Sequence, residues 1–322
     1  MFIMAVDFQI SYTLDVLSYI SCMLDEKKKN LYDEDIRRFM PMLGTVSDKY
    51  LEKLIKINQN TPDFMDHIIS MLIVNDHLHD WKTSDLLDRH KRLVVVFKKT
   101  KCFEKASKKL KRFIQGDYSK AMPLIKTIAA DLERLSFKKF WLEEKLPRLK
   151  ERNLEYQQKL DEFDIATHVN KWLVTDKIPT SGQWYMLAYG GVHFKLLLET
   201  YPVTSPLLLA DDLFKKVVSY GLEQVTYRPY LKGLKPTPDL KAEFKNHEDY
   251  KGFKGFLGYG EKSLKLALEV YLLENCGEKG FEISENYPFA MKLVDELREN
   301  KKPADEPVAN YIPQVIKTFS RK

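Results

Sequence analysis

The sequence predicts a mainly helical protein with a small antiparallel β hairpin, an α+β fold. Three observations predict it. Apolar residues recur at helical spacing over most of the chain, alternating runs occur only after Asp164, and the composition is that of a compact globular protein. The chain has 322 residues, 44% hydrophobic and 12% aromatic, with only 13 Gly and 14 Pro, which excludes collagen-like and disordered chains. We expect two domains, a helical one over residues 1–164 and an α+β one over residues 165–322.

Turn signals separate the helices expected in the first half. The first covers residues 6–24, where Ile10, Leu14 and Leu17 line one side. The later ones are expected from the Thr61-Pro62-Asp63 start signal onward, over 91–113, over 119–135 and over 137–163. Pro147 has no N–H to donate, so we expect a kink or a helix restart there.

Two strands are expected after Asp164, over residues 183–189 and 192–198. Gly190-Gly191 between them suits the positive φ values of a tight hairpin turn. Residues 205–209 are expected to add a third short strand. The remaining pattern predicts helices over residues 213–227, 261–275 and 289–300, a polar loop over 228–249 and a linker over 301–307.

The charge of the chain is unevenly distributed. The formal net charge is +6, but residues 82–150 carry 20 Lys or Arg against 8 Asp or Glu, which is +12 and leaves −6 for the rest. Within this basic segment, residues 91–112 hold ten basic side chains and one acid, Glu104, with apolar residues at helical spacing. The pattern predicts an amphipathic helix with a basic face.

The basic helix over residues 98–113 suggests an anion-binding surface. Its candidate residues are Lys98, Lys99, Lys105, Lys108, Lys109 and Arg112. Such a face suits nucleic-acid phosphates or an acidic lipid surface. A solvated lysine face that keeps the protein soluble explains the same pattern, and no nucleic-acid motif accompanies it.

Cysteine usage and hydropathy favour a soluble cytoplasmic protein. Cys22, Cys102 and Cys276 are too few and too scattered for a disulfide framework. Residues 1–10 are apolar without a basic leader, which disfavours a secretory signal. No apolar stretch approaches the ~20 residues that a membrane-spanning helix needs, so we expect no transmembrane segment.

No intact catalytic or metal motif is present. A helical zinc site requires two histidines four residues apart, and none of the seven histidines meets this requirement. The glycine-rich run over residues 251–263 resembles a phosphate loop, but Glu261 separates Gly260 from Lys262. No Gly-x-Ser-x-Gly nucleophile motif occurs. We therefore expect no metal and no cofactor.

The order of elements carries a resemblance to a known family. A helical first half with the segment Phe140–Pro147 is followed by the hairpin, by the helix containing Val217–Tyr227, and by a late helix that begins at Gly258–Glu261. This order resembles the gluzincin group of zinc metallopeptidases. In that group an antiparallel edge strand precedes a helix that carries His-Glu-x-x-His, and a later helix supplies a glutamate ligand.

The resemblance implies a degenerate zinc site. Tyr220 stands at the position of the first histidine, Gly221 at that of the catalytic glutamate and Gln224 at that of the second histidine, whereas Glu261 matches the third ligand. A tyrosine and a glutamine are poor zinc donors, and glycine cannot accept a proton from water. The resemblance therefore implies a pseudoenzyme with no catalytic residue, whose former cleft is closed by hydrogen bonds or holds a protein or peptide ligand.

Three function classes remain open from the sequence. The first is an inactive, metallopeptidase-like binding or regulatory module. The second is an anion-binding scaffold that acts through the basic helix. The third is an enzyme of unrelated mechanism on the His193 side of the hairpin.

Overall fold

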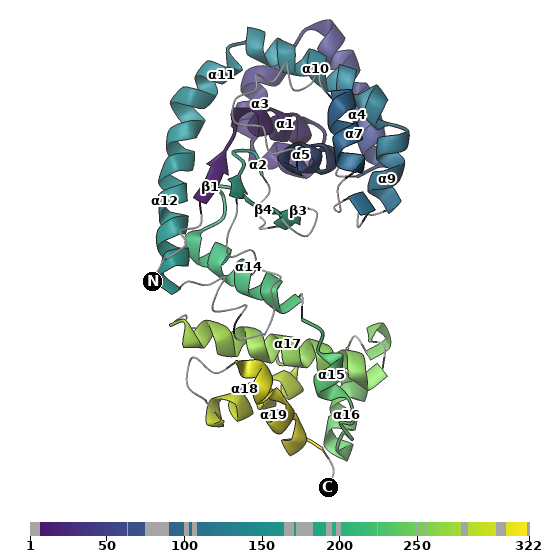
Figure 1. Cartoon of the computed structure of the whole chain (residues 1–322), viewed down its shortest axis with the longest axis vertical. Helices are drawn as coiled ribbons and strands as arrows, with labels where there is room; N and C mark the ends of the chain where they lie inside the picture. The colour runs from purple at the N-terminus through teal and green to yellow at the C-terminus, as the bar shows by residue number, and fades with distance from the viewer. Residues whose placement is uncertain are drawn as a thin grey trace. The chain divides into compact units, whose positions relative to one another are not determined.

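A computed structural model of the whole chain shows the fold (Figure 1). It describes residues 7–62, 64–74, 90–99, 103–104, 108–163, 171, 183–190, 195–197, 201–223, 225–248, 250–253, 255–277, 283–300 and 307–320. The chain forms two compact units. The N-terminal unit comprises Ala5–Gln157 and Ser181–Ala210, and the C-terminal unit comprises Met1–Met4, Gln158–Thr180 and Asp211–Lys322. This division differs from the single boundary expected after Asp164, because residues 181–210 return to the N-terminal unit.

The sheet of the N-terminal unit has four short strands in the order β1-β2-β4-β3. The strands are β1 (Asp7–Ile10), β2 (Gln183–Met186), β3 (Lys195–Leu197) and β4 (Tyr201–Thr204). The three strands β1, β2 and β4 run parallel, with Phe8 opposite Trp184 and Tyr185 opposite Val203. Only β3 is antiparallel among the strands that the structure describes, and it pairs with β4 at the edge of the sheet. The expected mainly helical fold with a small sheet is confirmed (Figure 1).

The predicted antiparallel hairpin is wrong. The strands β2 and β3 are not neighbours, because β4 is inserted between them and pairs with both. Gly190 does not adopt a positive φ; instead, a Cβ atom on it would lie 2.8 Å from the Cβ of Ser205. Glycine is needed there so that the segment after β2 can approach the segment after β4. Gly191 and His193 lie outside the described residues.

Two other strand predictions are wrong. Residues 7–10 form β1 rather than the start of a helix, and the third strand is β4 rather than residues 205–209. Both strands form through pairing with β2, and the partner of β1 lies more than 170 positions further along the chain. A four-residue strand is too short to show a clear alternating pattern in the sequence, and its pairing partner is too distant to be found from the local sequence.

Helix α1 runs through the interior of the N-terminal unit. It begins after Ser11, whose hydroxyl accepts a hydrogen bond from Leu14 N, and Leu14, Leu17 and Ile20 are fully buried. It packs against α5 and α10. The helices from α1 to α12 are α1 (Tyr12–Met23), α2 (Glu26–Leu31), α3 (Asp33–Phe39), η1 (Met40–Met42), α4 (Thr45–Asn60), α5 (Phe64–Val74), α7 (His90–Lys98), α9 (Lys108–Gln115), α10 (Tyr118–Arg134), α11 (Phe137–Phe140), η3 (Trp141–Lys145) and α12 (Leu146–Phe163).

Two long predicted helices differ from regular α-helices. The basic segment is not one helix, because α7 ends at Lys98 with Lys99 in a turn and α9 begins at Lys108. The helix predicted over residues 137–163 contains the π-helical turn η3, and α12 follows it directly from Leu146, immediately before Pro147. Leu146 keeps right-handed helical dihedral angles (φ −56°, ψ −43°), so the helix continues from η3 into α12 and the predicted restart at Pro147 is not seen; a π-helical turn precedes the proline instead.

The C-terminal unit is helical in the part of the chain that the structure describes. Its elements are α14 (Ala210–Glu223), α15 (Arg228–Leu231), α16 (Pro238–Asn246), η4 (Tyr250–Gly252), α17 (Gly255–Asn275), α18 (Pro288–Glu299), η5 (Val308–Asn310) and α19 (Ile312–Thr318). The polar loop expected over residues 228–249 is wrong, since α15 and α16 lie within it. Thr237 caps α16 by accepting a hydrogen bond from Leu240 N. The long helix α17 begins at Gly255, earlier than expected, and packs against α18.

Among the described residues, no helix combines the length and the apolar character that crossing a bilayer requires.

Candidate functional site

The degenerate zinc site predicted from the resemblance falls within the C-terminal unit. Tyr220 is half-buried in the last turn of α14, and Gly221 is buried beside it. Gln224 lies outside the described residues. Gly221 offers no side chain to the interior of the unit, so no proton acceptor stands at the position that the resemblance assigns to the catalytic glutamate.

Glu261, the last member of this set, is held in an ion pair. Its Oε1 atom lies 3.2 Å from Nε of Arg228, and one turn further along α17 the Nζ atom of Lys265 lies 2.7 Å from Oε1 of Glu223. The second pair joins α17 to the end of α14. The end of α14 thus lies beside the first half of α17, but the carboxylate of Glu261 is engaged by a guanidinium. Within the described ranges, no three His, Cys, Asp or Glu side chains form a group that could hold a metal ion.

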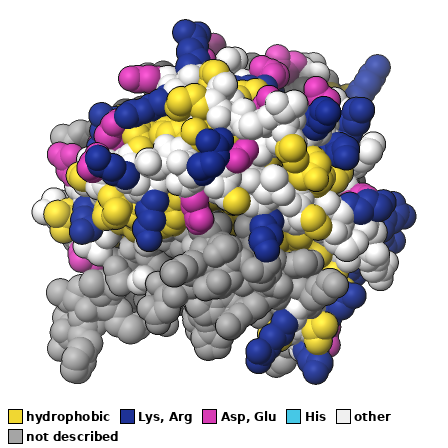
Figure 2. Space-filling model, turned by 90° about the horizontal axis from the view of Figure 1, so that it is seen from above, with side chains coloured by type: hydrophobic (Ala, Val, Ile, Leu, Met, Phe, Trp, Pro, Cys, Tyr) yellow, Lys and Arg dark blue, Asp and Glu magenta, His cyan; other side chains and the backbone are white. Residues whose placement is uncertain are grey.

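The predicted basic patch is only partly described. Lys98, Lys99, Lys108 and Arg112 are exposed, whereas Lys105 and the side chain of Lys109 lie outside the described residues. Phe97, Leu110 and Phe113 are buried on the apolar side, as the amphipathic pattern requires. On the face seen in Figure 2, Lys and Arg side chains are dispersed, with acidic side chains among them, rather than gathered in one continuous field.

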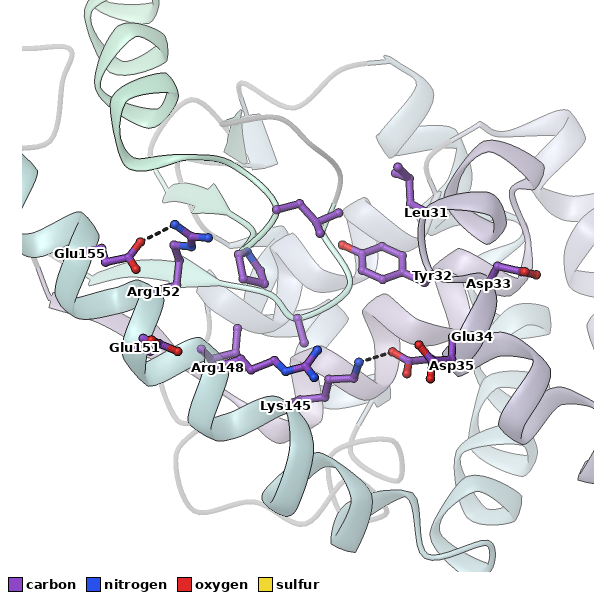
Figure 3. A pocket seen from close by; sticks show the side chains of 14 residues that line it. Leu31, Tyr32, Asp33, Glu34, Asp35, Lys145, Arg148, Glu151, Arg152 and Glu155 are labelled. Atoms are coloured by element: carbon purple, nitrogen blue, oxygen red, sulfur yellow. Dashed lines mark hydrogen bonds and ion pairs between the residues drawn. The ribbon is translucent and has the colours of Figure 1, made fainter.

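A site that the sequence did not indicate lies in the N-terminal unit, where a groove has a volume of about 540 Å³ (Figure 3). One wall comes from the end of α2 and the start of α3, and the other from the end of η3 and α12. Between them lie residues that follow β2 and β4. The lining residues are Leu31, Tyr32, Asp33, Glu34, Asp35, Lys145, Arg148, Leu149, Glu151, Arg152, Glu155, Ala188, Pro206 and Leu207.

The position of the groove follows from the topology of the sheet. The strands β2 and β4 are parallel and end at Met186 and Thr204, so Ala188 and Pro206 follow their carboxyl ends. Ligand sites in open sheets with parallel strands lie outside the carboxyl ends of the strands. The parallel pairing that replaces the predicted hairpin therefore creates a concave surface where such a site is expected.

Two of the three basic residues that line the groove form ion pairs with acidic residues that also line it. Nζ of Lys145 lies 2.5 Å from Oδ2 of Asp35, and both side chains are largely buried. Arg152 is paired with Glu155 along α12. The Lys145–Asp35 pair joins the two walls (Figure 3).

Three other charged residues of the lining form no ion pair within the described parts of the chain. Arg148 and Glu151 on α12 and Glu34 on α3 are exposed, and no ion pair or hydrogen bond of their side chains is found within the described parts of the chain. Asp33 differs from Glu34, because it pairs with Arg37 at 2.7 Å. Among the described residues, the groove thus offers a ligand one unpaired guanidinium group and two unpaired carboxylates. The charges that a ligand meets there are of both signs.

Apolar surface accompanies these charges. Leu31 and Leu207 are exposed at the groove, whereas Leu149 is buried in the α12 wall. The Tyr32 hydroxyl donates a hydrogen bond to the carbonyl oxygen of Gly190, which fixes the aromatic ring against the segment after β2. A ligand in the groove would therefore meet apolar groups between charged ones.

A buried carboxylate supports the segment at the base of the groove. Asp15 on α1 is fully buried and accepts hydrogen bonds from Nε1 of Trp141 at 2.7 Å and from the backbone N of Ala188 at 2.6 Å. Burial raises the pKa of Asp15 to about 7, while these two donors oppose the rise. Asp15 holds Ala188 in place and does not itself line the groove.

The sequence carries only a weak signal for this groove. Lys145, Arg148 and Arg152 recur at helical spacing, as do charges on any solvated helix face. Nothing local indicates that residues 31–35, 145–155, 188 and 206–207 meet, because they come together only through the pairing of the strands.

No protein-family model, curated protein or solved structure matches this chain. The gluzincin-like resemblance thus rests on the sequence pattern alone.

Proposed function

We propose that this protein is a non-catalytic ligand-binding module whose binding site is the groove of the N-terminal unit. One observation carries the proposal: a concave site of about 540 Å³ exposes apolar groups together with charges that are unpaired among the described residues. Its volume falls within the ~300–1,000 Å³ typical of small-ligand sites. The paired Lys145 and Asp35 brace its walls, so the site is formed before a ligand binds.

The absence of catalysis is part of the proposal. The resemblance to gluzincins loses its hairpin in the structure, where β4 lies between β2 and β3, so the proposal takes from it only the residues at the expected helix positions. Tyr220 and Gly221 replace a metal ligand and a proton acceptor, and Glu261 pairs with Arg228. The C-terminal unit then has a structural or regulatory role.

Metal analysis of the purified chain tests the loss of catalysis. We expect substoichiometric zinc after dialysis against zinc-containing buffer, because only one of the expected donors is a carboxylate and it is paired. One equivalent of zinc in the native chain, lost in Glu261→Gln, would contradict the proposal.

A ligand screen with matched variants tests the groove. A thermal-shift screen of short peptides, amino acids, nucleotides and sugar phosphates should identify compounds that stabilise the native chain, since a ligand specific for the folded state raises its stability by mass action. Leu207→Trp, which fills the groove, should abolish the shift. Leu209→Trp, in the same exposed segment but outside the lining, should leave it unchanged.

The outcome of the screen is decisive in either direction. Stabilisation that survives Leu207→Trp would place the ligand elsewhere, and a screen without any stabilising compound would remove the support for a binding function.

A second candidate function is polyanion binding by the α7 and α9 surface, favoured by the exposure of Lys98, Lys99, Lys108 and Arg112. We expect single-stranded DNA to bind at low salt with a log–log salt slope of about −3 if all four residues neutralise phosphates, at ~−0.7 for each phosphate. Vesicles with phosphatidylserine test the acidic-lipid alternative.

A charge-matched comparison tests this surface. Replacing the four residues by Gln should abolish binding. Replacing four other exposed lysines, Lys49, Lys53, Lys120 and Lys139, should preserve most of it. Absence of any binding at low salt would exclude this function.

A further inference from the structure

We infer that the groove of the N-terminal unit binds a zwitterionic ligand of the class of short peptides with free ends, with the ligand's carboxylate on Arg148 and its ammonium group on Glu34. This inference rests on the proposed function and adds the ligand class to it.

Arg148 is the cation available to a ligand. The other two basic residues of the lining, Lys145 and Arg152, already pair with Asp35 and Glu155. The guanidinium group of Arg148 is exposed on the α12 wall and points into the region between the walls (Figure 3). A guanidinium presents donors in a planar fork that matches a carboxylate with two parallel hydrogen bonds.

Glu34 is the corresponding anion on the opposite wall. Its neighbours Asp33 and Asp35 are engaged by Arg37 and Lys145, whereas Glu34 is exposed and forms no ion pair among the described residues. Arg38, which pairs with Glu144, attracts Glu34 only at longer range. A carboxylate on one wall and a guanidinium on the other match the two ends of a zwitterion.

The charge of the lining disfavours a purely anionic ligand. Five acidic residues line the groove against three basic ones, although the carboxylate of Asp33 points away from it and pairs with Arg37, and Glu151 lies only one turn from Arg148 on α12. A phosphate or a dicarboxylate would gain Arg148 but would be repelled by Glu34 and Glu151. A ligand with an ammonium group as well as a carboxylate avoids that cost.

The apolar part of the groove favours a ligand with an apolar group between its two charges. Leu31 and Leu207 are exposed at the groove, whereas Tyr32 is largely buried in the α2–α3 wall (Figure 3). A peptide with aliphatic side chains covers this surface and removes it from water. Tri-leucine with free ends is therefore the probe of choice.

Three forms of one probe separate the two charge contacts. Binding of tri-leucine with free ends, with an acetylated N-terminus and with an amidated C-terminus is measured by isothermal titration calorimetry on the full chain. We expect each blocking group to weaken binding about tenfold, because it removes one charge-assisted contact.

Two variants then assign each contact to a residue. In Arg148→Gln the free and amidated peptides should bind equally, and in Glu34→Gln the free and acetylated peptides should bind equally. Lys150→Gln and Glu52→Gln, at exposed positions outside the lining on α12 and α4, should retain both tenfold differences.

Each contrary result has its own meaning. Loss of the acetylation effect in Glu151→Gln instead of Glu34→Gln would overturn the placement of the ammonium group. Failure of all three peptides, while another compound loses its stabilising effect in Leu207→Trp, would overturn the ligand class and leave the proposed function standing. Failure of every compound would overturn both.

Discussion

A single carboxyl group, that of Asp15, connects the interior of the N-terminal unit to the groove. It is fully buried, and the two groups that donate hydrogen bonds to it, on Trp141 and Ala188, are neutral N–H donors rather than cations. Ionising such a group is costly, which is why burial raises its pKa from 3.8 to about 7. The segment that carries Ala188 is thus held by a carboxyl group whose ionisation is disfavoured by burial.

The raised pKa predicts how stability depends on pH. The folded state binds the Asp15 proton more tightly than the unfolded state, so this stabilising contribution is fully present below about pH 4 and is lost as the pH rises through about 7. Asp15→Asn should remove this dependence, on the order of a few kcal/mol. Urea unfolding of the native chain and the variant between pH 4 and pH 8 measures the difference.

An exposed acid provides the control for this experiment. Asp48→Asn on α4 should change the pH profile of stability far less than Asp15→Asn does, since the Asp48 side chain stays in water. The amide introduced by Asp15→Asn has a single acceptor oxygen and serves only one of Trp141 and Ala188, which adds a loss of about 1–3 kcal/mol at every pH. A difference between the Asp15 variant and the native chain that does not vary with pH would refute a raised pKa.

The absence of a side chain at Gly190 allows the segments after β2 and β4 to lie close together. Gly190→Ala places a Cβ atom 2.8 Å from Cβ of Ser205 and 3.3 Å from the carbonyl oxygen of Leu187, so we expect a loss of about 1–3 kcal/mol by overpacking. Gly116→Ala is the matched control, because its nearest contact would be an ordinary 3.5 Å. Equal unfolding midpoints for the two variants would show that the segments after β2 and β4 can separate without cost.

At the scale of elements, the Lys145–Asp35 pair joins α3 to the end of η3. The two side chains are only 17% and 10% exposed, so removing one partner leaves a charge poorly solvated. Lys145→Met should cost about 3 kcal/mol in the free energy of unfolding, in line with other broken buried pairs. Chemical denaturation measures the loss.

A surface pair on the same stretch of helix provides the comparison. Lys139 and Glu143 lie 3.9 Å apart at 74% and 62% exposure, so Lys139→Met should cost less than about 0.5 kcal/mol. Adding Asp35→Asn to the Lys145 variant should recover part of the loss. Similar costs for the two lysine substitutions would show that the buried pair contributes no more than a surface pair.

The helices and strands show which parts of the fold could be predicted from the sequence and which could not. Helices α5, α10, α14 and α18 follow from local apolar periodicity and are confirmed. The pairing of β1, β2 and β4 was missed because it depends on distant partners, and Gly190-Gly191 carried the local signature of a hairpin turn. The groove was missed for the same reason, since its walls meet only after the parallel strands have paired.

For the molecule as a whole, the division into two compact units has a thermodynamic consequence. The N-terminal unit is built around α1 and the C-terminal unit around α17, and Leu17 and Leu268 are fully buried in these helices. Truncating either leucine to alanine removes about 2–5 kcal/mol from the unit that contains it. We expect the two cores to unfold in separate cooperative transitions, so each variant should lower one transition and leave the other in place.

Differential scanning calorimetry tests this expectation on the full chain. Leu17→Ala should lower the midpoint of one transition by about 5–10 °C, and Leu268→Ala should lower that of the other by a similar amount. A groove ligand should raise only the transition that Leu17→Ala lowers, because every lining residue belongs to the N-terminal unit. A single transition that both variants lower equally would show that the two units unfold as one cooperative body, and the ligand would then stabilise the whole chain.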